Sequence, residues 1–164
     1  LGDVQALVRF GHKHLTEACF LLLQVKDPAA ARAWLARAPV TSAVKTDKLP
    51  ETALQVALTS EGLRALQVAP DLYAEFSAEF VAGMASDATR ARRLGDVGAS
   101  DPGGWQWGAG ERVPHVAVLL YAVPGRLATW EQEIETQLAG VHIKEQRLQR
   151  LSAAQREYLQ RWTR

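Results

Sequence analysis

The chain contains 164 residues, a usual length for one domain, and its 19 basic and 18 acidic residues give no global charge that favours nucleic acid as a partner. Its longest apolar runs, residues 19–23 and 116–123, are much shorter than the ~20 residues that a membrane-spanning helix needs. Cys19 is the single cysteine, which excludes an intramolecular disulfide, and its apolar surroundings predict an inert core thiol.

The first part of the chain alternates strand and helix patterns. A continuous apolar run predicts a central strand at residues 17–25. Asp27 and Pro28 then form a typical helix start, as N-cap and first helical residue, and Pro39 ends the helix. The expected buried stripe of this helix is Ala31, Trp34, Leu35 and Ala38.

Two further strands are predicted before the next helices. Residues 40–46 are rich in Val and Thr, and residues 52–59 alternate between apolar and other residues. Two short helices follow, with Ser60 and Ser77 as their expected N-caps. The apolar face expected for the second strand consists of Leu54, Val56 and Leu58.

A long irregular segment, residues 87–114, precedes an apolar strand at residues 115–123. A helix is predicted at residues 126–139, with Gly140 as the residue that follows its end. Residues 141–148 are more polar and are expected to form an edge strand. The stripe that the helix is expected to bury is Leu127, Trp130, Ile134 and Leu138.

This order of elements predicts an α+β fold of the ferredoxin-like class. We expect a split β-α-β unit with an antiparallel sheet, helices on one face, a loop insertion and extra C-terminal β and α elements. The expected division is a domain over residues 1–150 and a C-terminal helix over residues 151–164, which opens on a capping-box pattern. This fold is common and does not by itself name a function.

The residues that could carry chemistry form no reactive constellation. The glycines of residues 95–110 lack the strand–glycine–helix context of a nucleotide cradle. His12 and His14 could share a metal in an extended segment, but solvated or loop histidines are the preferred interpretation. Cys19 lies within a strand, where a nucleophile is poorly placed. His115 and His142 complete the histidines, and together they give no closed zinc ligand set.

The charged and aromatic residues also have ordinary structural explanations. The carboxylate pairs Asp71 with Glu75 and Glu131 with Glu135 are expected on solvated helix faces. An RNA-binding sheet would need several exposed aromatic residues on its two central strands, and these strands supply only Phe20 and Tyr121. Two basic clusters are expected at helix ends or edges, namely Arg90, Arg92 and Arg93, and Arg150, Arg156, Arg161 and Arg164. We therefore predict no catalytic, cofactor-binding or metal-binding residue in this chain.

Five segments carry a family resemblance. They are residues 3–9, with Ala6 where a glycine is usual, residues 20–35, residues 51–66, residues 76–84, and the loop 94–108 that contains Trp105 and Trp107 and is followed by His115. In order and spacing they resemble the N-terminal ferredoxin-like half of the dye-decolourising (DyP-type) haem peroxidases. The resemblance covers about residues 3–140 and fades after Gly140.

The resemblance implies a peroxidase that binds haem b and oxidises dyes or phenolics with hydrogen peroxide. In that family a second ferredoxin-like half supplies the proximal histidine, a distal arginine and a Gly-x-x-Asp-Gly segment with the distal aspartate. No Gly-x-x-Asp-Gly occurs in this sequence, so no catalytic or haem-ligand residue is carried over. We expect no cofactor in this chain alone.

Three explanations stay open. The leading explanation is that the chain is an excised N-terminal scaffold half of a peroxidase, which its start at Leu1 rather than at a methionine favours. It could instead be a naturally short interaction or small-ligand-binding protein without haem, or a chain whose haem half is a separate partner. Self-association to a homo-oligomer is expected from the uncovered sheet, together with a cytoplasmic location and no nucleic-acid or membrane partner. Trp105 and Trp107 are expected to pack within their loop rather than to contact a ligand.

Overall fold

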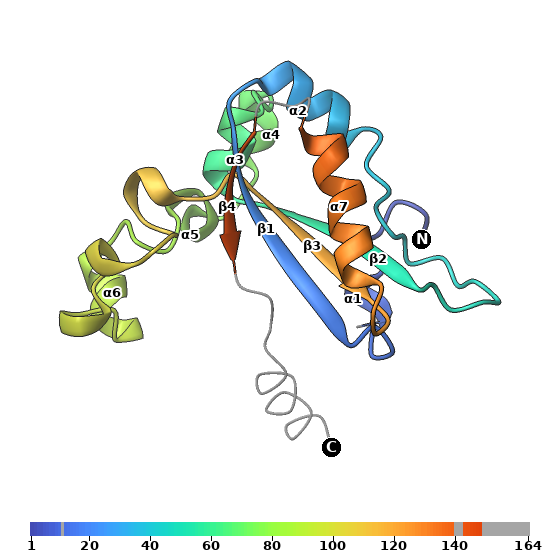
Figure 1. The fold of residues 1–164 in the computed structure, drawn as a ribbon. Helices are drawn as coiled ribbons and strands as arrows, with labels where there is room; N and C mark the ends of the chain where they lie inside the picture. Colours follow the sequence, from blue (N-terminus) through green and yellow to red (C-terminus); the bar gives the residue numbers. More distant parts are fainter. Residues whose placement is uncertain (11, 140–142, 149–164) are drawn as a thin grey trace.

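The computed structural model describes residues 1–10, 12–139 and 143–148, and it shows an α+β fold (Figure 1). Four strands form one sheet in the order β2-β3-β1-β4, and each neighbouring pair is antiparallel. The strands are β1 (Glu17–Val25), β2 (Thr52–Leu58), β3 (Val116–Ala122) and β4 (Ile143–Leu148). The predicted central and edge positions of β1 and β4 are therefore confirmed.

The sheet places β3 between β1 and β2, which run in the same direction. Leu120 of β3 is opposite Cys19 of β1 and Leu54 of β2, so these three side chains lie on one face. The residues of β3 alternate strictly between buried and half-buried along its length. One face of the sheet is therefore the core face, and the other face is only partly covered.

Two helices cover the core face, α2 (Pro28–Leu35) and α7 (Leu127–Leu138) (Figure 1). Asp27 caps α2 as predicted, because its carboxylate accepts hydrogen bonds from the N–H groups of Ala29 and Ala30. The helices bury one stripe each against the strands, which places the core between one helical layer and one sheet. The buried helical residues of this core are Ala31, Trp34, Leu127, Ile134 and Leu138.

The helix α3 (Ser60–Ala65) packs unusually close to the start of β3. A Cβ atom on Gly62 would lie only 1.8 Å from the backbone oxygen of His115, so only glycine fits there. The N-cap of this helix is Thr59 rather than the predicted Ser60, because the Thr59 hydroxyl accepts the N–H of Gly62. Ser60 lies inside the helix, and its hydroxyl donates to the carbonyl of Val81.

An arm, defined here as residues 70–112, extends from the sheet between α3 and β3 (Figure 1). Ser77 caps one of its helices as predicted. The segment 87–114 was expected to be irregular, but Asp87 and Gly95 frame a regular helix by capping both of its ends. The arm contains the short helices α4 (Pro70–Ala74), α5 (Ala78–Ala82) and α6 (Ala88–Leu94), and 3₁₀ turns at Gly98–Ser100, Pro102–Gly104 and Gly110–Arg112.

The strand predicted at residues 40–46 is wrong. Only Ser42 makes a bridge, to Gln5, and the chain contacts the outer edge of β2 through Thr41 instead. The Thr41 backbone N–H donates to Leu54, and its hydroxyl accepts from the Leu54 N–H. Because the threonine side chain replaces a backbone carbonyl, no regular ladder continues. The predictions for Gly140, His142 and the helix 151–164 lie outside the described residues.

Candidate functional site

The second face of the sheet contains an open strip, defined here as Ala18, Phe20, Ala117, Leu119 and Tyr121. All five side chains are half-buried, although β1 and β3, the strands that carry them, are apolar. The register places Ala18 opposite Tyr121 and Phe20 opposite Leu119, which makes the strip continuous. Phe20 and Tyr121 meet edge to face, with their ring centroids 6.1 Å apart. The strip carries no charged side chain, so it is a candidate contact surface.

An N-terminal strap, defined here as residues 1–10 and 12–16 and including α1 (Leu7–Phe10), lies against this face at Gln55 and Tyr121. The side chain of Gln55 points onto this face and is buried at 2% exposure. Its amide oxygen accepts the N–H of Leu7, and its amide nitrogen donates to the carbonyls of Thr41 and Leu54. Gln55 therefore fixes the strap to β2.

His12 holds the far end of the strap. Its ring is 5.4 Å from the ring of Tyr121, and the residue is only 4% exposed. Its backbone φ of +49° lies in the left-handed region, which is uncommon for a residue other than glycine. Burial, followed by the charge of His14, lowers the pKa of His12 from 6.5. His12 lies in a loop, as the preferred interpretation of solvated or loop histidines allowed, but it is buried rather than solvated because the strap folds it onto the sheet.

The three described histidines serve different structural roles. The His14 Nε2 atom is 2.8 Å from the carbonyl oxygen of Pro50, so the backbone of Pro50 engages this ring nitrogen. His115 accepts the N–H of Val25 at its Nδ1 atom, 3.0 Å away, and so extends the pairing of β1 with β3. Burial lowers the pKa of His115 from 6.5. Within the described residues no three His, Cys, Asp or Glu side chains form a group that could hold a metal ion.

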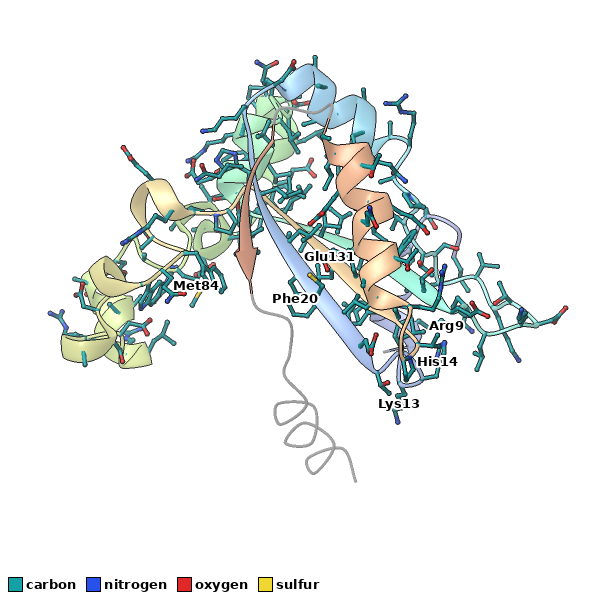
Figure 2. All side chains as sticks on the ribbon, viewed as in Figure 1. Arg9, Lys13, His14, Phe20, Met84 and Glu131 are labelled. Atoms are coloured by element: carbon teal, nitrogen blue, oxygen red, sulfur yellow. The ribbon has the colours of Figure 1, made fainter. Side chains whose placement is uncertain are left out.

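The core face contains a buried polar pair. The Cys19 thiol donates to the Glu131 carboxylate, with Sγ and Oε1 3.4 Å apart, and the two residues are 3% and 7% exposed. Figure 2 shows Glu131 between α7 and the sheet, whereas Phe20 lies on the other side of β1. The prediction of a solvated Glu131 is wrong because it lies four residues after Leu127, on the buried stripe. That spacing was the available signal. Cys19 is a core thiol as predicted.

The other charged residues singled out from the sequence are explained by local contacts. Asp71 and Glu75 are exposed, as predicted. Arg90 donates to the carbonyl of Gly83 at 2.7 Å and thereby satisfies the end of α5. Arg92 and Arg93 lie in the last turn of α6, where positive charge compensates the helix dipole. The described structure brings none of these residues together with the histidines or with Cys19.

The tryptophan loop is held mainly by its own contacts. The Trp105 indole N–H donates to the carbonyl of Ser100, 2.8 Å away, and its ring lies over Gly108. Gly108 has a φ of +97°, and its N–H donates to the carbonyl of Arg112. The Arg112 side chain in turn donates to the carbonyl of Gly103. Trp107 is 41% exposed. Trp105 is therefore a packing residue of the loop, and Trp107 faces solvent.

Comparisons with solved structures place this fold. A fungal DyP-type peroxidase from Auricularia auricula-judae matches with a TM-score of 0.68 and 22% identity over 91% of this chain. A dye-decolorizing peroxidase engineered in the haem pocket for asymmetric sulfoxidation matches with a TM-score of 0.67 and 24% identity over 90% of this chain. A dye-decolorizing peroxidase in complex with 2,6-dimethoxyphenol matches with a TM-score of 0.66 and 21% identity over 91% of this chain.

The chain has a partial DyP-type peroxidase fold. It spans about a third of those structures, namely 32%, 32% and 34% of their lengths. No protein-family profile matches the sequence, and no curated protein matches it either. The α+β architecture with an antiparallel sheet agrees with this DyP-type fold. Among the described residues, no helix is both long and apolar enough to cross a membrane.

The described residues do not fit a haem site of their own. A haem iron needs an axial ligand such as a histidine whose ring nitrogen faces an open space. The Nε2 atom of His12 is buried, that of His14 lies against Pro50, and the Nδ1 atom of His115 accepts from Val25. The distal Gly-x-x-Asp-Gly segment of the DyP-type family is also absent from the sequence. One ring nitrogen of each described histidine is therefore buried or engaged by the backbone, which does not support a haem ligand among these three.

Proposed function

We propose that this chain is the N-terminal scaffold and assembly domain of a DyP-type haem peroxidase and is not catalytic alone. The observation that carries the proposal is the fold match, which covers nine tenths of this chain but only a third of each peroxidase. The strand order β2-β3-β1-β4 supports the ferredoxin-like assignment, because β3 splits the β1-α2-β2 unit. We assign this ferredoxin-like domain to residues 1–150 and keep a C-terminal helix at residues 151–164 as a prediction.

The partner of this domain would be a haem-binding half, either in the same protein or in a separate chain. In the complete enzyme that half would bind haem b, which supplies hydrogen-peroxide-dependent oxidation. The open strip supports the existence of such a partner, because five uncharged half-buried side chains form a continuous surface on the sheet. In the absence of the half, the same surface favours self-association to a homo-oligomer.

Adding haemin to the purified chain tests the scaffold assignment. We expect no stoichiometric Soret band and no peroxide-dependent dye oxidation, because one ring nitrogen of each described histidine is buried or engaged by the backbone. Tight one-to-one haemin binding with turnover would contradict the proposal. Serum albumin, which binds haemin without the DyP fold, serves as the positive control for the optical measurement.

Sedimentation velocity tests self-association through the open strip. The wild-type chain is expected to gain mass as its concentration rises, and F20E is expected to remain monomeric because it places a charge in the strip. L49E is the matched control, since Leu49 is 66% exposed and lies outside the strip. A monomeric wild type at all concentrations, or equal behaviour of F20E and L49E, would contradict this surface.

The alternative is a stand-alone interaction or small-ligand-binding protein without haem. The exposed side chain of Trp107 favours it, because a large aromatic group at the surface is a frequent contact residue. Saturable binding of an aromatic ligand, measured by quenching of the tryptophan fluorescence and lost in W107A, would support this alternative. The cytoplasmic location expected from the sequence stays a prediction.

A further inference from the structure

The strap has two unequal attachments to the sheet. Its near end is held by a row of hydrogen bonds, in which the Ala6 N–H donates to Thr41 at 2.8 Å and the Ala43 N–H donates to Val4 at 2.7 Å. Its far end is held by two buried side chains, His12 at 4% and Leu15 at 5% exposure, and by one hydrogen bond between the His14 ring and the carbonyl of Pro50. The attachment of the far end therefore depends on whether the surroundings of the His12 ring tolerate its protonation.

The His12 ring lies in surroundings that do not stabilise a positive charge. Its Nε2 atom is buried, and it finds no hydrogen-bond partner in the described part of the chain. The ring contacts Tyr121, whose cross-strand neighbours Ala18 and Ala53 are uncharged. A buried nitrogen without a partner is already unfavourable, and a charged imidazolium there would be more so.

The titratable groups around this ring do not offset that cost. From β3, the titratable group that contacts the His12 ring is Tyr121. Burial raises the pKa of Tyr121, so its hydroxyl stays neutral. Along the chain the nearest are Lys13 and His14 in the strap, Arg9 in α1 and Glu17 at the start of β1. His14 lowers the pKa of His12, and no carboxylate among the described residues raises it.

We propose that neutral His12 is a latch that holds the far end of the strap on the second face of the sheet, and that protonation of its ring releases this end. Release would uncover the face of Tyr121 beneath the ring and so enlarge the open strip. The latch is a property of this chain and goes beyond the proposed function. It holds or fails whether or not the chain belongs to a peroxidase.

The direction of the pH dependence follows from the pKa. The released strap exposes His12 to water, where its pKa is about 6.5, and the bound strap lowers that pKa. The latch is therefore fully closed above about pH 6.5 and weakens as the pH falls from there toward the lower pKa of the bound state. Within that window the ratio of released to bound strap rises by up to about tenfold for each pH unit.

Proton–nitrogen NMR spectra of the full chain between about pH 8 and about pH 5 test the latch. The Leu7 and Leu15 amides report on the near and far ends of the strap. We expect the Leu15 signal to shift or broaden with a midpoint below 6.5, ahead of Leu7. The Val25 amide, which donates to His115, reports separately on titration of that histidine.

Variants at His12 and His14 complete the test. H12N does not titrate and tolerates the left-handed backbone, so the Leu15 change should disappear while the spectrum stays folded. H12F removes the same proton with a ring of similar size, and it replaces H12N if that variant unfolds. H14Q retains a donor toward Pro50 but removes the neighbouring charge, so the midpoint should move up. The latch is overturned if wild type and the non-titrating variants show the same Leu15 response.

Discussion

Gln5 closes the outer edge of β2 by pairing its side-chain amide with the backbone of Val56. The amide oxygen accepts the Val56 N–H at 2.7 Å, and the amide nitrogen donates to the Val56 carbonyl at 2.8 Å. One side chain thus makes both hydrogen bonds that a neighbouring strand would make at this position. Because an unpaired edge invites pairing with another chain, Gln5 also protects the sheet from edge-to-edge aggregation.

Q5A should therefore lower the free energy of unfolding by about 1–3 kcal/mol, because two backbone groups of Val56 lose their partner. Q5E keeps the acceptor but loses the donor, so its loss should be intermediate at neutral pH. Urea unfolding followed by circular dichroism measures both changes. An unchanged midpoint for Q5A would show that water replaces the side chain at no cost.

Gly62→Ala should be among the most destabilising small substitutions in this chain. The new methyl group would meet backbone atoms of His115, which cannot move aside without shifting α3 from the sheet. We expect a loss of about 3 kcal/mol or more in the free energy of unfolding. Gly104→Ala is the matched control, because a Cβ atom there meets nothing within 4 Å. Equal thermal midpoints for the two variants would refute the close packing.

The Cys19 thiol should react slowly with a thiol-specific disulfide reagent in the native state. The residue is 3% exposed, and its Sγ lies against the Glu131 carboxylate, which disfavours the reactive thiolate. The reaction should become complete within the mixing time once urea unfolds the chain. Because Cys19 is the single cysteine, the absorbance change follows this site alone. Rapid labelling of the folded chain would contradict its burial.

The His115 side chain should make stability depend on pH separately from the strap. Its Nδ1 atom accepts the Val25 N–H only when that nitrogen carries no proton, and burial lowers its pKa below 6.5. The stabilisation is therefore complete above about pH 6.5 and is lost as the pH falls toward the pKa of the folded state. The H12N background removes the strap histidine from the measurement. There, H115N should flatten the curve of unfolding free energy between about pH 7.5 and about pH 5.5; an unchanged slope would rule out this bond as the cause.

The two loop tryptophans should differ in their effect on stability. W105F removes the hydrogen bond to Ser100 and part of the ring over Gly108, and we expect a loss of about 1 kcal/mol. W107F should change the free energy of unfolding by no more than about 0.5 kcal/mol, because the Trp107 side chain is 41% exposed and faces solvent. Comparable losses would indicate that Trp107 also packs in the loop.

Periodicity was sufficient to predict the elements that bury a regular stripe. The central strand, the Asp27 cap and the apolar residues of α7 follow directly from spacing and capping chemistry. The resemblance to DyP-type peroxidases, taken from ordered motifs, agrees with the structural matches. Glu131 is the exception, because its residue type predicts a solvated position whereas its place on the stripe buries it.

The contacts of the second face could not be predicted from local patterns. Gln5, His12 and Gln55 act through partners that are distant in sequence, such as Val56, Tyr121 and Leu7. The same is true of Thr41, whose hydroxyl replaces a strand carbonyl and breaks the ladder that Val and Thr content suggested. Side chains that satisfy distant backbone groups leave no period in the sequence.

The arm enters and leaves the sheet at a single paired position. Leu58 at the end of β2 is opposite Val116 at the start of β3, although the whole arm lies between them in the chain. The segment therefore behaves as one long connection whose ends are fixed together by the sheet. Each halving of its length should lower the entropy cost of closing that connection by about 0.6 kcal/mol. This junction is consequently a natural place to shorten the chain, or to graft another segment, without changing the register of β2 and β3.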